Sequence, residues 1–574
     1  MFEKNSEIIK YLEARGKVIL NACPGSGKTT SIAYKLQTLT NEIPNIYGNF
    51  SGVACLSFTN IAKDEINIKY KSFSGNFIKY PHLITTIDSF INQYIVLPHY
   101  HLLIEKIKRP IILEEERINK LTYFILKKFK IKNKEVFYKY APQNIQITID
   151  KKYLFKGKKP NLTDKDLETF NNYCKTLKKW QFENGLLTQN DIPYVAINIL
   201  KKFPEIGKSL VKRFPLIILD EAQDTSEIHF AIFDKLIKLG LENIEIVGDP
   251  YQSLYEWRTA RPEKFINIYQ DKKNWIVCDY TFCRRSEQNI VNAYSILRNL
   301  DKPIISLLPN ISNKITIYKY NKGNENEVVI KFLEHTKSYQ QNHIVVRSRD
   351  LLNKLLGFNQ TKNYWKSNIP YSLILAKKYL MKNENKKAIN LVRRIVFKIL
   401  NPSLNYQELR RVEIELQNDY QLNSQIIKLI NDLPSFDLNL KDWSYKTEKY
   451  ITSFFKLETQ IDFKLKQKQG KSYDISIANL YNTDIVKNNY PISTIHQVKG
   501  KTFDTILLFL NNNSKGKSIS LNDYKKPNSF PNEKKRMIYV AMSRPKYLLA
   551  IAVPSEINNK NLEKIFGNDI KIYE

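Results

Sequence analysis

The stretch that decides the fold is Ala22-Cys23-Pro24-Gly25-Ser26-Gly27-Lys28-Thr29. It follows the apolar run Val18-Ile19-Leu20, which predicts a buried strand, and it precedes a pattern over residues 30–36 that predicts a helix. A glycine-rich turn between a buried strand and a helix is the setting of a phosphate-binding loop. The sequence therefore predicts that this turn holds the phosphates of a nucleotide.

The residue types within the loop suit that task. Gly25 and Gly27 let the backbone turn its N–H groups toward an anion, and the helix N-terminus adds the positive end of its dipole. Lys28 is placed to reach the β- and γ-phosphates, and the Thr29 hydroxyl is a natural ligand for Mg²⁺. Ala22 stands where the general pattern has a glycine, and a small residue still fits there. The predicted nucleotide-binding residues are Ala22, Pro24, Gly25, Ser26, Gly27, Lys28, Thr29 and Thr30.

Length and charge bound the class of protein. The chain has 574 residues and a formal net charge of +33. A chain of this length is expected to form about three or four domains. The positive surplus indicates a polyanionic partner such as nucleic acid, or else it reflects the lysine-rich coding of an AT-rich genome. Charge alone leaves both interpretations open.

The five cysteines argue against a metal centre, because they form no Cys-x-x-Cys pair and no cluster with histidine. Cys23 lies inside the phosphate loop, which indicates a reducing compartment. The N-terminus has no apolar signal core, and no apolar run is long enough to span a membrane. We therefore expect a cytoplasmic protein without a membrane partner.

Further strand and helix signals alternate along the chain. Val53-Ala54-Cys55-Leu56-Ser57-Phe58 predicts a second buried strand, and Thr59-Asn60 predicts the cap of the helix that follows. Residues 83–90 predict another strand and turn. This alternation favours a parallel, doubly wound α/β sheet. Phe58, at a strand end, lies where ligands meet such sheets.

Two acids follow the next buried strand. Leu216-Ile217-Ile218-Leu219 leads directly into Asp220 and Glu221. Carboxylates at the tip of a buried strand are costly unless a cation lies beside them, and a magnesium-bound nucleotide supplies one. Asp220 is predicted to hold the metal, and Glu221 to activate the attacking water. The alternative is that both acids only cap the next helix.

The strand Ile244-Glu245-Ile246-Val247 precedes a loop with a mixed set of side chains. Gln252 supplies an amide for a γ-phosphate, and Tyr255 and Trp257 follow it closely. These two aromatics either stack on nucleic-acid bases or pack in the core at helical spacing.

Two lysine-rich stretches with helical periodicity interrupt the sheet patterns, at about 100–186 and 386–487. In the first, aromatic residues are interleaved with the lysines, which suits a nucleic-acid backbone and its bases. A solvated lysine face over an ordinary aromatic core explains the same pattern. Beyond the first sheet, strands of a second sheet are predicted at Trp275-Ile276-Val277, Ile315-Thr316-Ile317 and Ile344-Val345-Val346.

The chain resembles superfamily 1 DNA helicases of the UvrD/Rep/PcrA type. The resemblance rests on six motif blocks in the family's order, at residues 22–29, 56–62, 220–225, 248–258, 494–500 and 539–544. It implies an α/β fold of two RecA-like parallel-sheet lobes, each with a mainly helical insertion. The implied boundaries are 1–99 and 185–279 for the first lobe, 100–184 for its insertion, 280–385 and 488–574 for the second lobe, and 386–487 for the second insertion.

The resemblance also implies residue roles. ATP and Mg²⁺ are the expected cofactors, with Thr29 and Asp220 on the metal. Arg285 is expected to contact the γ-phosphate, and Arg544 to act as the arginine finger. The residues expected to contact single-stranded or tailed duplex DNA are Phe58, Thr59, Asn60, Tyr255, Trp257 and His496. The catalytic set is Lys28, Asp220, Glu221, Gln252, Arg285 and Arg544.

Several positions depart from the family pattern. Arg284 replaces the tyrosine expected to stack on adenine, Thr30 replaces an arginine, and Thr502 replaces the glutamate expected on the ribose. The glutamine that reads adenine is not evident near Ser6. An arginine plane also stacks on a base, so we expect ATP with weak discrimination against GTP.

Two functions remain open at this stage. One is an ATP-driven 3′→5′ translocase or helicase on DNA. The other is a regulatory ATPase subunit that senses DNA ends and activates a partner nuclease, as in anti-phage systems of the Gabija type. The short second insertion and the departures near adenine favour the latter modestly.

Overall fold

The computed structural model describes residues 3–113, 144–254, 260–299, 302–309, 313–356, 364–381, 383–400, 419–457, 463–465, 476–478, 490–512 and 518–574. The chain forms two compact units. The first unit comprises Met1–Tyr320, Thr336–Gln341 and Ile495–Glu574, and the second comprises Asn321–His335 and Asn342–Thr494. In the described residues, no helix is long and apolar enough to cross a membrane.

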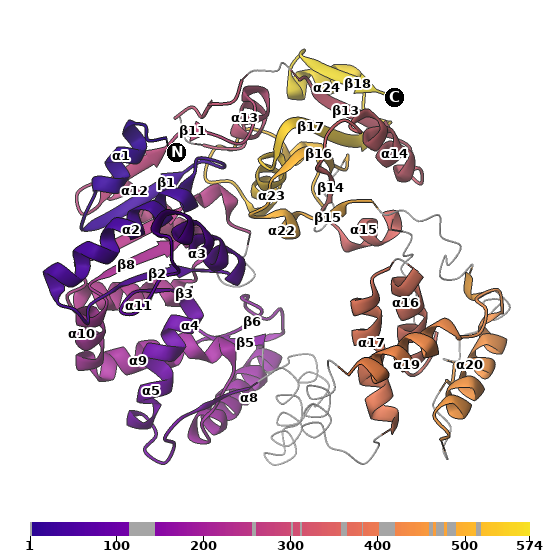
Figure 1. Cartoon of the computed structure of the whole chain (residues 1–574), viewed down its shortest axis with the longest axis horizontal. Helices are drawn as coiled ribbons and strands as arrows, with labels where there is room; N and C mark the ends of the chain where they lie inside the picture. The colour runs from indigo at the N-terminus through magenta and orange to yellow at the C-terminus, as the bar shows by residue number, and fades with distance from the viewer. Residues whose placement is uncertain are drawn as a thin grey trace. The chain divides into compact units, whose positions relative to one another are not determined.

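A six-stranded parallel sheet forms the centre of the N-terminal half (Figure 1). Its strand order is β10-β1-β9-β8-β2-β3. The bounds are β1 (Lys17–Ala22), β2 (Val53–Ser57), β3 (Leu83–Thr86), β8 (Leu216–Asp220), β9 (Asn243–Gly248) and β10 (Ile276–Tyr280). The central strands are buried on both faces, which is why they are apolar almost throughout.

Two layers of helices cover this sheet. Val18 and Leu20 pack with α1 (Ser6–Glu13), α2 (Lys28–Tyr47) and α3 (Asn60–Ser74) on one face. Ile19 points to the other face. That face is covered by α4 (Ile87–Ile91), α9 (Ile192–Lys202), α10 (Pro204–Arg213), α11 (Glu227–Lys238) and α12 (Pro262–Gln270). This confirms the doubly wound sheet that the sequence predicts.

An unbroken helical run leaves the carboxyl end of β3. It consists of α4, the π-helical segment η1 (Asn92–Val96), α5 (Leu97–His99) and the 3₁₀ segment η2 (Tyr100–Leu102). Beyond it, the described part of the predicted first insertion holds the antiparallel pair β5 (Ile145–Ile147) and β6 (Tyr153–Phe155), followed by α8 (Asp164–Glu183). Strand β4 (Ile111–Ile112) pairs with β7 (Leu186–Leu187). The interleaved lysine and aromatic residues between positions 127 and 140, considered above for contact with nucleic acid, lie outside the described residues.

A second set of parallel strands follows in the first unit, in the order β16-β17-β13-β18. The bounds are β13 (Ile315–Tyr320), β16 (Phe503–Phe509), β17 (Pro545–Pro554) and β18 (Ile570–Tyr573). The helices of this part are α13 (Gln288–Ser295), α22 (Ile495–Val498), α23 (Glu533–Met542) and α24 (Asn559–Phe566). A short parallel pair, β11 (Phe282–Cys283) and β12 (Ile305–Ser306), lies beside α13.

One strand prediction is wrong. Residues 275–277 were expected in the second sheet, but β10 pairs with β1 in the first sheet, with Val18 opposite Ile276 and Ala22 opposite Tyr280. The apolar pattern of this segment identifies a strand without identifying its neighbour. The edge of β1 provides that neighbour, so the first sheet extends to Tyr280.

The second unit has its own hydrophobic core. Its helices are α14 (Glu325–His335), α15 (Arg349–Leu355), α16 (Ile369–Met381), α17 (Asn385–Leu400), α19 (Tyr420–Asn431) and α20 (Leu440–Phe454). Strands β14 (Asn342–Val346) and β15 (Ile492–Thr494) pair in parallel. Trp365 and Trp443 are fully buried at the centre of the helical core, with ring centroids 5.8 Å apart.

Candidate nucleotide-binding site

The phosphate loop has the backbone geometry that an anion site needs. Gly25 and Gly27 have φ angles of +73° and +89°, a region that other residues enter only with strain. Helix α2 begins at Lys28, and Gly27 provides no side-chain cap, so the first N–H groups of the helix remain for a ligand. The Ser26 hydroxyl is buried and has no hydrogen-bond partner among the described residues. These features fit a nucleotide phosphate.

Two carboxylates share the ammonium group of Lys28. Its Nζ contacts Oε1 of Glu221 and lies 3.5 Å from Oδ1 of Asp220. Glu221 has a positive φ of +54°, and its Oε2 accepts a hydrogen bond of 2.6 Å from Gln223. The strand β8 therefore ends by turning both acids toward Lys28 of the phosphate loop.

The electrostatics of this cluster differ between the two acids. Burial raises the pKa of Asp220 to about 6, against the attraction of Lys28. Burial also opposes ionisation of Glu221, but Lys28, Lys499 and the bond from Gln223 outweigh it and lower the pKa of Glu221 to about 2. The closer acid, Glu221, thus holds the negative charge that pairs with Lys28.

Lys499 is a functional candidate that sequence reasoning missed. Its Nζ contacts Asp224, donates a 2.9 Å hydrogen bond to the carbonyl oxygen of Gln252, and lies 3.9 Å from Oε2 of Glu221. Burial raises the pKa of Asp224, although Lys499 draws it down. Lys499 belongs to the quoted block 494–500, and its position three residues after His496 was the available signal.

Gln252 connects this cluster to the C-terminal part of the first unit. Its Nε2 donates to Asp249 at 2.8 Å, and its Oε1 accepts a 2.6 Å bond from the guanidinium of Arg544. Tyr539 donates to the same Asp249 carboxylate at 3.1 Å. Burial and the neighbouring Arg285 lower the pKa of Arg544 to about 9.

Arg285 lies against the phosphate loop. A Cβ added at Gly25 would lie 2.4 Å from the Cβ of Arg285, so the two backbones are in close contact. The Arg285 guanidinium donates to the Ser543 carbonyl oxygen at 3.3 Å. Arg285 and Arg544, predicted to act on the phosphates, lie in the same unit as Lys28, and Arg285 contacts its loop.

Family comparisons agree with this geometry. The UvrD/REP helicase N-terminal domain matches residues 3–273, and the UvrD-like helicase C-terminal domain matches residues 472–556. The chain belongs to the UvrD-like superfamily 1 helicases. The two matches and the parallel sheets confirm the predicted α/β fold with RecA-like lobes.

The chain is similar to three bacterial proteins, among others. A probable DNA helicase II homolog of Mycoplasma capricolum is 26% identical over 309 residues, covering 51% of this chain and 41% of the relative. The ATP-dependent DNA helicase PcrA of Staphylococcus aureus is 26% identical over 221 residues, covering 37% and 29%. The ATP-dependent DNA helicase Rep of Buchnera aphidicola is 25% identical over 425 residues, covering 70% and 60%. The matches thus span less than two thirds of each relative.

The positions that depart from the family pattern lie beside the loop. The Arg284 N–H donates to the Gly25 carbonyl oxygen at 2.9 Å, and its guanidinium lies 3.4 Å from Glu3. The Thr30 hydroxyl accepts a 3.1 Å bond from Lys69. Stacking of Arg284 on a base stays a prediction.

The predicted DNA-contacting residues fall into three groups. Thr59 caps α3 by accepting a 3.2 Å bond from the Ala62 N–H, with Phe58 half-buried and Asn60 exposed beside it. His496 lies half-buried on α22. Tyr255 and Trp257 lie outside the described residues. Contact of these residues with DNA stays a prediction.

Proposed function

We propose that the chain is a DNA-dependent ATPase that moves 3′→5′ along single-stranded DNA and separates tailed duplexes. The observation that carries the proposal is the contact of Arg544 with Gln252 beside Lys28 and Glu221. Lysine, carboxylate and arginine groups of one hydrolytic site would thus come from residues spread over more than 500 positions, from Lys28 to Arg544. The family membership supports the same activity.

The residues present fit a magnesium nucleotide. The uncapped start of α2 and the unpartnered Ser26 hydroxyl would hold the phosphates. Thr29 and Asp220 would hold Mg²⁺, which when bound neutralises charge on the phosphate oxygens. Lys28 would leave Glu221 for the more negative phosphates, since a single ammonium cannot remain closest to both.

Glu221 and the two arginines would then perform the chemistry. Once Lys28 has left, Glu221 is less stabilised as an anion, so its pKa rises and it becomes a better acceptor for the proton of the attacking water. Arg544 and Arg285 stabilise the charge that develops on the phosphates. Gln252 bonds both to Arg544 and to Asp249, which also accepts a hydrogen bond from Tyr539. A movement of Arg544 would therefore displace Gln252 and the Asp249–Tyr539 contact.

The movement on DNA would be coupled through α22. This short helix carries His496, expected on the single strand, and it is followed directly by Lys499, which contacts Asp224 and approaches Glu221. A DNA strand that moves α22 would therefore also move the Lys499 ammonium group relative to Glu221 and Asp224. The proposal thus explains why hydrolysis would depend on DNA.

The test is ATPase activity with and without single-stranded DNA, together with strand displacement on duplexes carrying a 3′ or a 5′ tail. We expect stimulation by DNA and displacement from the 3′ tail. Hydrolysis that ignores DNA, or displacement only from the 5′ tail, would contradict the proposal.

A regulatory ATPase subunit that activates a partner nuclease is the second candidate. The position of Arg284, held by Glu3 beside the phosphate loop, and the short stretch available for the second insertion favour it. Strand displacement with and without a protein that copurifies from the native host separates the two. ATPase activity without unwinding, together with a stable nuclease complex, would support the regulator.

A further inference from the structure

A cavity of about 500 Å³ lies in the first unit, outside the nucleotide site described above. Its walls come from α9, from the end of α8 and from the segment that ends the helical run after β3. None of its lining residues belongs to the predicted ATP or DNA sets. Pockets of about 300–1,000 Å³ hold small organic ligands, so the size suits one.

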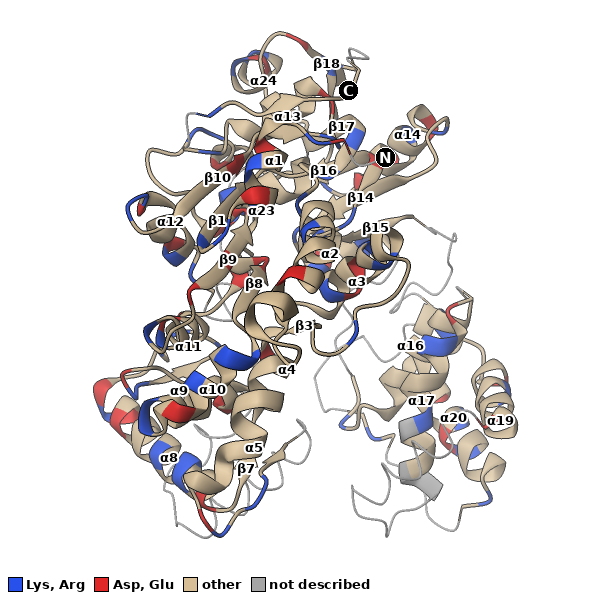
Figure 2. Ribbon diagram, turned by 60° about the vertical axis from the view of Figure 1, so that its left-hand side comes forward, with Lys and Arg blue, Asp and Glu red and all other residues tan. Residues whose placement is uncertain are grey.

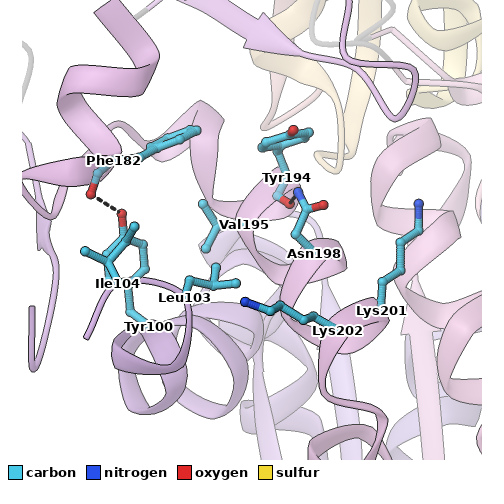
Figure 3. A pocket seen from close by; sticks show the side chains of 9 residues that line it. All are labelled: Tyr100, Leu103, Ile104, Phe182, Tyr194, Val195, Asn198, Lys201 and Lys202. Atoms are coloured by element: carbon cyan, nitrogen blue, oxygen red, sulfur yellow. Dashed lines mark hydrogen bonds between the residues drawn. The ribbon is translucent and has the colours of Figure 1, made fainter. Parts of the chain in front are cut away.

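Two aromatic rings form one side of the cavity. The rings of Phe182 and Tyr194 are nearly parallel, at 17°, with centroids 6.2 Å apart. Figure 3 shows these rings on one side, with Leu103 and Ile104 on the other. The space between flat rings and aliphatic side chains suits a planar heterocycle, because aromatic faces stack on bases without regard to sequence.

The polar side-chain groups of the cavity are an amide, two ammonium groups and the hydroxyls of Tyr100 and Tyr194, of which the Tyr100 hydroxyl donates to the Phe182 carbonyl oxygen. The Nδ2 of Asn198 donates to the Tyr194 carbonyl oxygen at 2.7 Å, so its Oδ1 is the atom left to accept a bond from a ligand. Lys201 and Lys202 line the cavity, and both are exposed. Among the described lining residues there is no carboxylate, and neither lysine forms a described ion pair.

The positive charge at the cavity comes from Lys201 and Lys202, the only charged residues of α9. Figure 2 shows basic and acidic residues together on α8, which carries four lysines and four acids. A ligand with negative charge is therefore attracted to the two lysines of α9. An uncharged apolar ligand would leave both lysines and the Asn198 oxygen without a partner.

We propose that this cavity binds one nucleotide, with its base against Phe182 and Tyr194 and its phosphate at Lys201 and Lys202. The Asn198 oxygen would accept a hydrogen bond from an amino group of the base. The nucleotide is either free in solution or one residue of a bound strand, since both present the same chemistry. The site is separate from the phosphate loop, so this inference holds or fails independently of the ATPase proposal.

Photochemical crosslinking to the full chain tests the inference. One arm uses 8-azidoadenosine monophosphate, and the other uses a single-stranded oligonucleotide containing 5-iodouracil. Trypsin cleaves after Lys179 and Lys201, so residues 180–201 form one peptide that holds both rings and Asn198. We expect saturable label on this peptide, and equal label in the Lys28→Ala variant, whose phosphate loop should bind ATP weakly. The probe that labels this peptide, the mononucleotide or the oligonucleotide, identifies whether the ligand is a free nucleotide or part of a strand.

Variants make the result specific. Tyr194→Ala removes one stacking face, and Lys202→Glu reverses one charge on the surface without altering the interior. Each should raise the ligand concentration for half-maximal label by about tenfold or more. Lys238→Glu, an exposed lysine on α11 outside the cavity, is the matched control and should label like the unaltered chain. Absence of label from both arms, or equal label in Lys202→Glu, would overturn the inference.

Discussion

Replacement of Glu221 by glutamine separates catalysis from nucleotide binding. The change keeps the shape of the side chain and an oxygen for the 2.6 Å bond from Gln223, but it removes the negative charge that contacts Lys28. Loss of a general base lowers kcat by about 10²–10⁴. That corresponds to about 3–5 kcal/mol in the activation free energy.

The same substitution has a calculable effect on stability and affinity. A hydrogen bond to a charged group contributes about 1.5–3 kcal/mol. Asp220, 3.5 Å from the Lys28 ammonium, still compensates part of its charge. We therefore expect the free energy of unfolding to fall by an amount at the lower end of that range. Lys28 is then held less tightly by protein groups, and the dissociation constant for ATP should stay the same or decrease.

The assay combines single-turnover hydrolysis with equilibrium binding of a fluorescent ATP analogue, both with single-stranded DNA present. Glu227→Gln is the matched control, because Glu227 is half exposed on α11 and only approaches Arg261, at 3.7 Å. A kcat for Glu221→Gln within tenfold of the unaltered chain would refute the assignment of the base. A large loss of ATP affinity would refute the view that Lys28 is shared between Glu221 and the phosphates.

Three further predictions follow from the same site. Lys28→Ala should abolish turnover and weaken ATP binding in the same binding assay, the opposite of the affinity result for Glu221→Gln; retained turnover contradicts the site. Gly25→Ala places a Cβ 2.4 Å from Arg285 at a φ of +73° and should lower the midpoint of thermal unfolding, whereas Gly240→Ala, strained at +107° but with open space around it, should cost less. Because the pKa of Arg544 in the protein without nucleotide is lowered to about 9, its positive charge is lost as pH rises through that value, and kcat/KM should fall between pH 8 and 10; a flat kcat/KM profile to pH 10 contradicts its role.

Local features of the site were predictable from sequence, whereas long-range partners were not. The phosphate loop is decided by glycines, a strand and a helix within about twenty residues, and the structure has these elements where they were expected. The contact between Lys499 and Asp224 joins residues 275 positions apart, and no periodic pattern in the sequence predicts such a pairing. The strand at 276–280 illustrates the same limit, because its apolar pattern is compatible with either sheet.

The separate core around Trp365 and Trp443 has a consequence for thermodynamic measurements. A unit that buries its own apolar side chains can lose its fold while the rest of the chain keeps its own. Calorimetry of the whole protein should therefore resolve two heat-absorption peaks, and a two-state fit would return an enthalpy that belongs to neither unit. The fluorescence of these two indoles reports the melting of the helical unit, so it is the wrong signal for following damage at the phosphate loop.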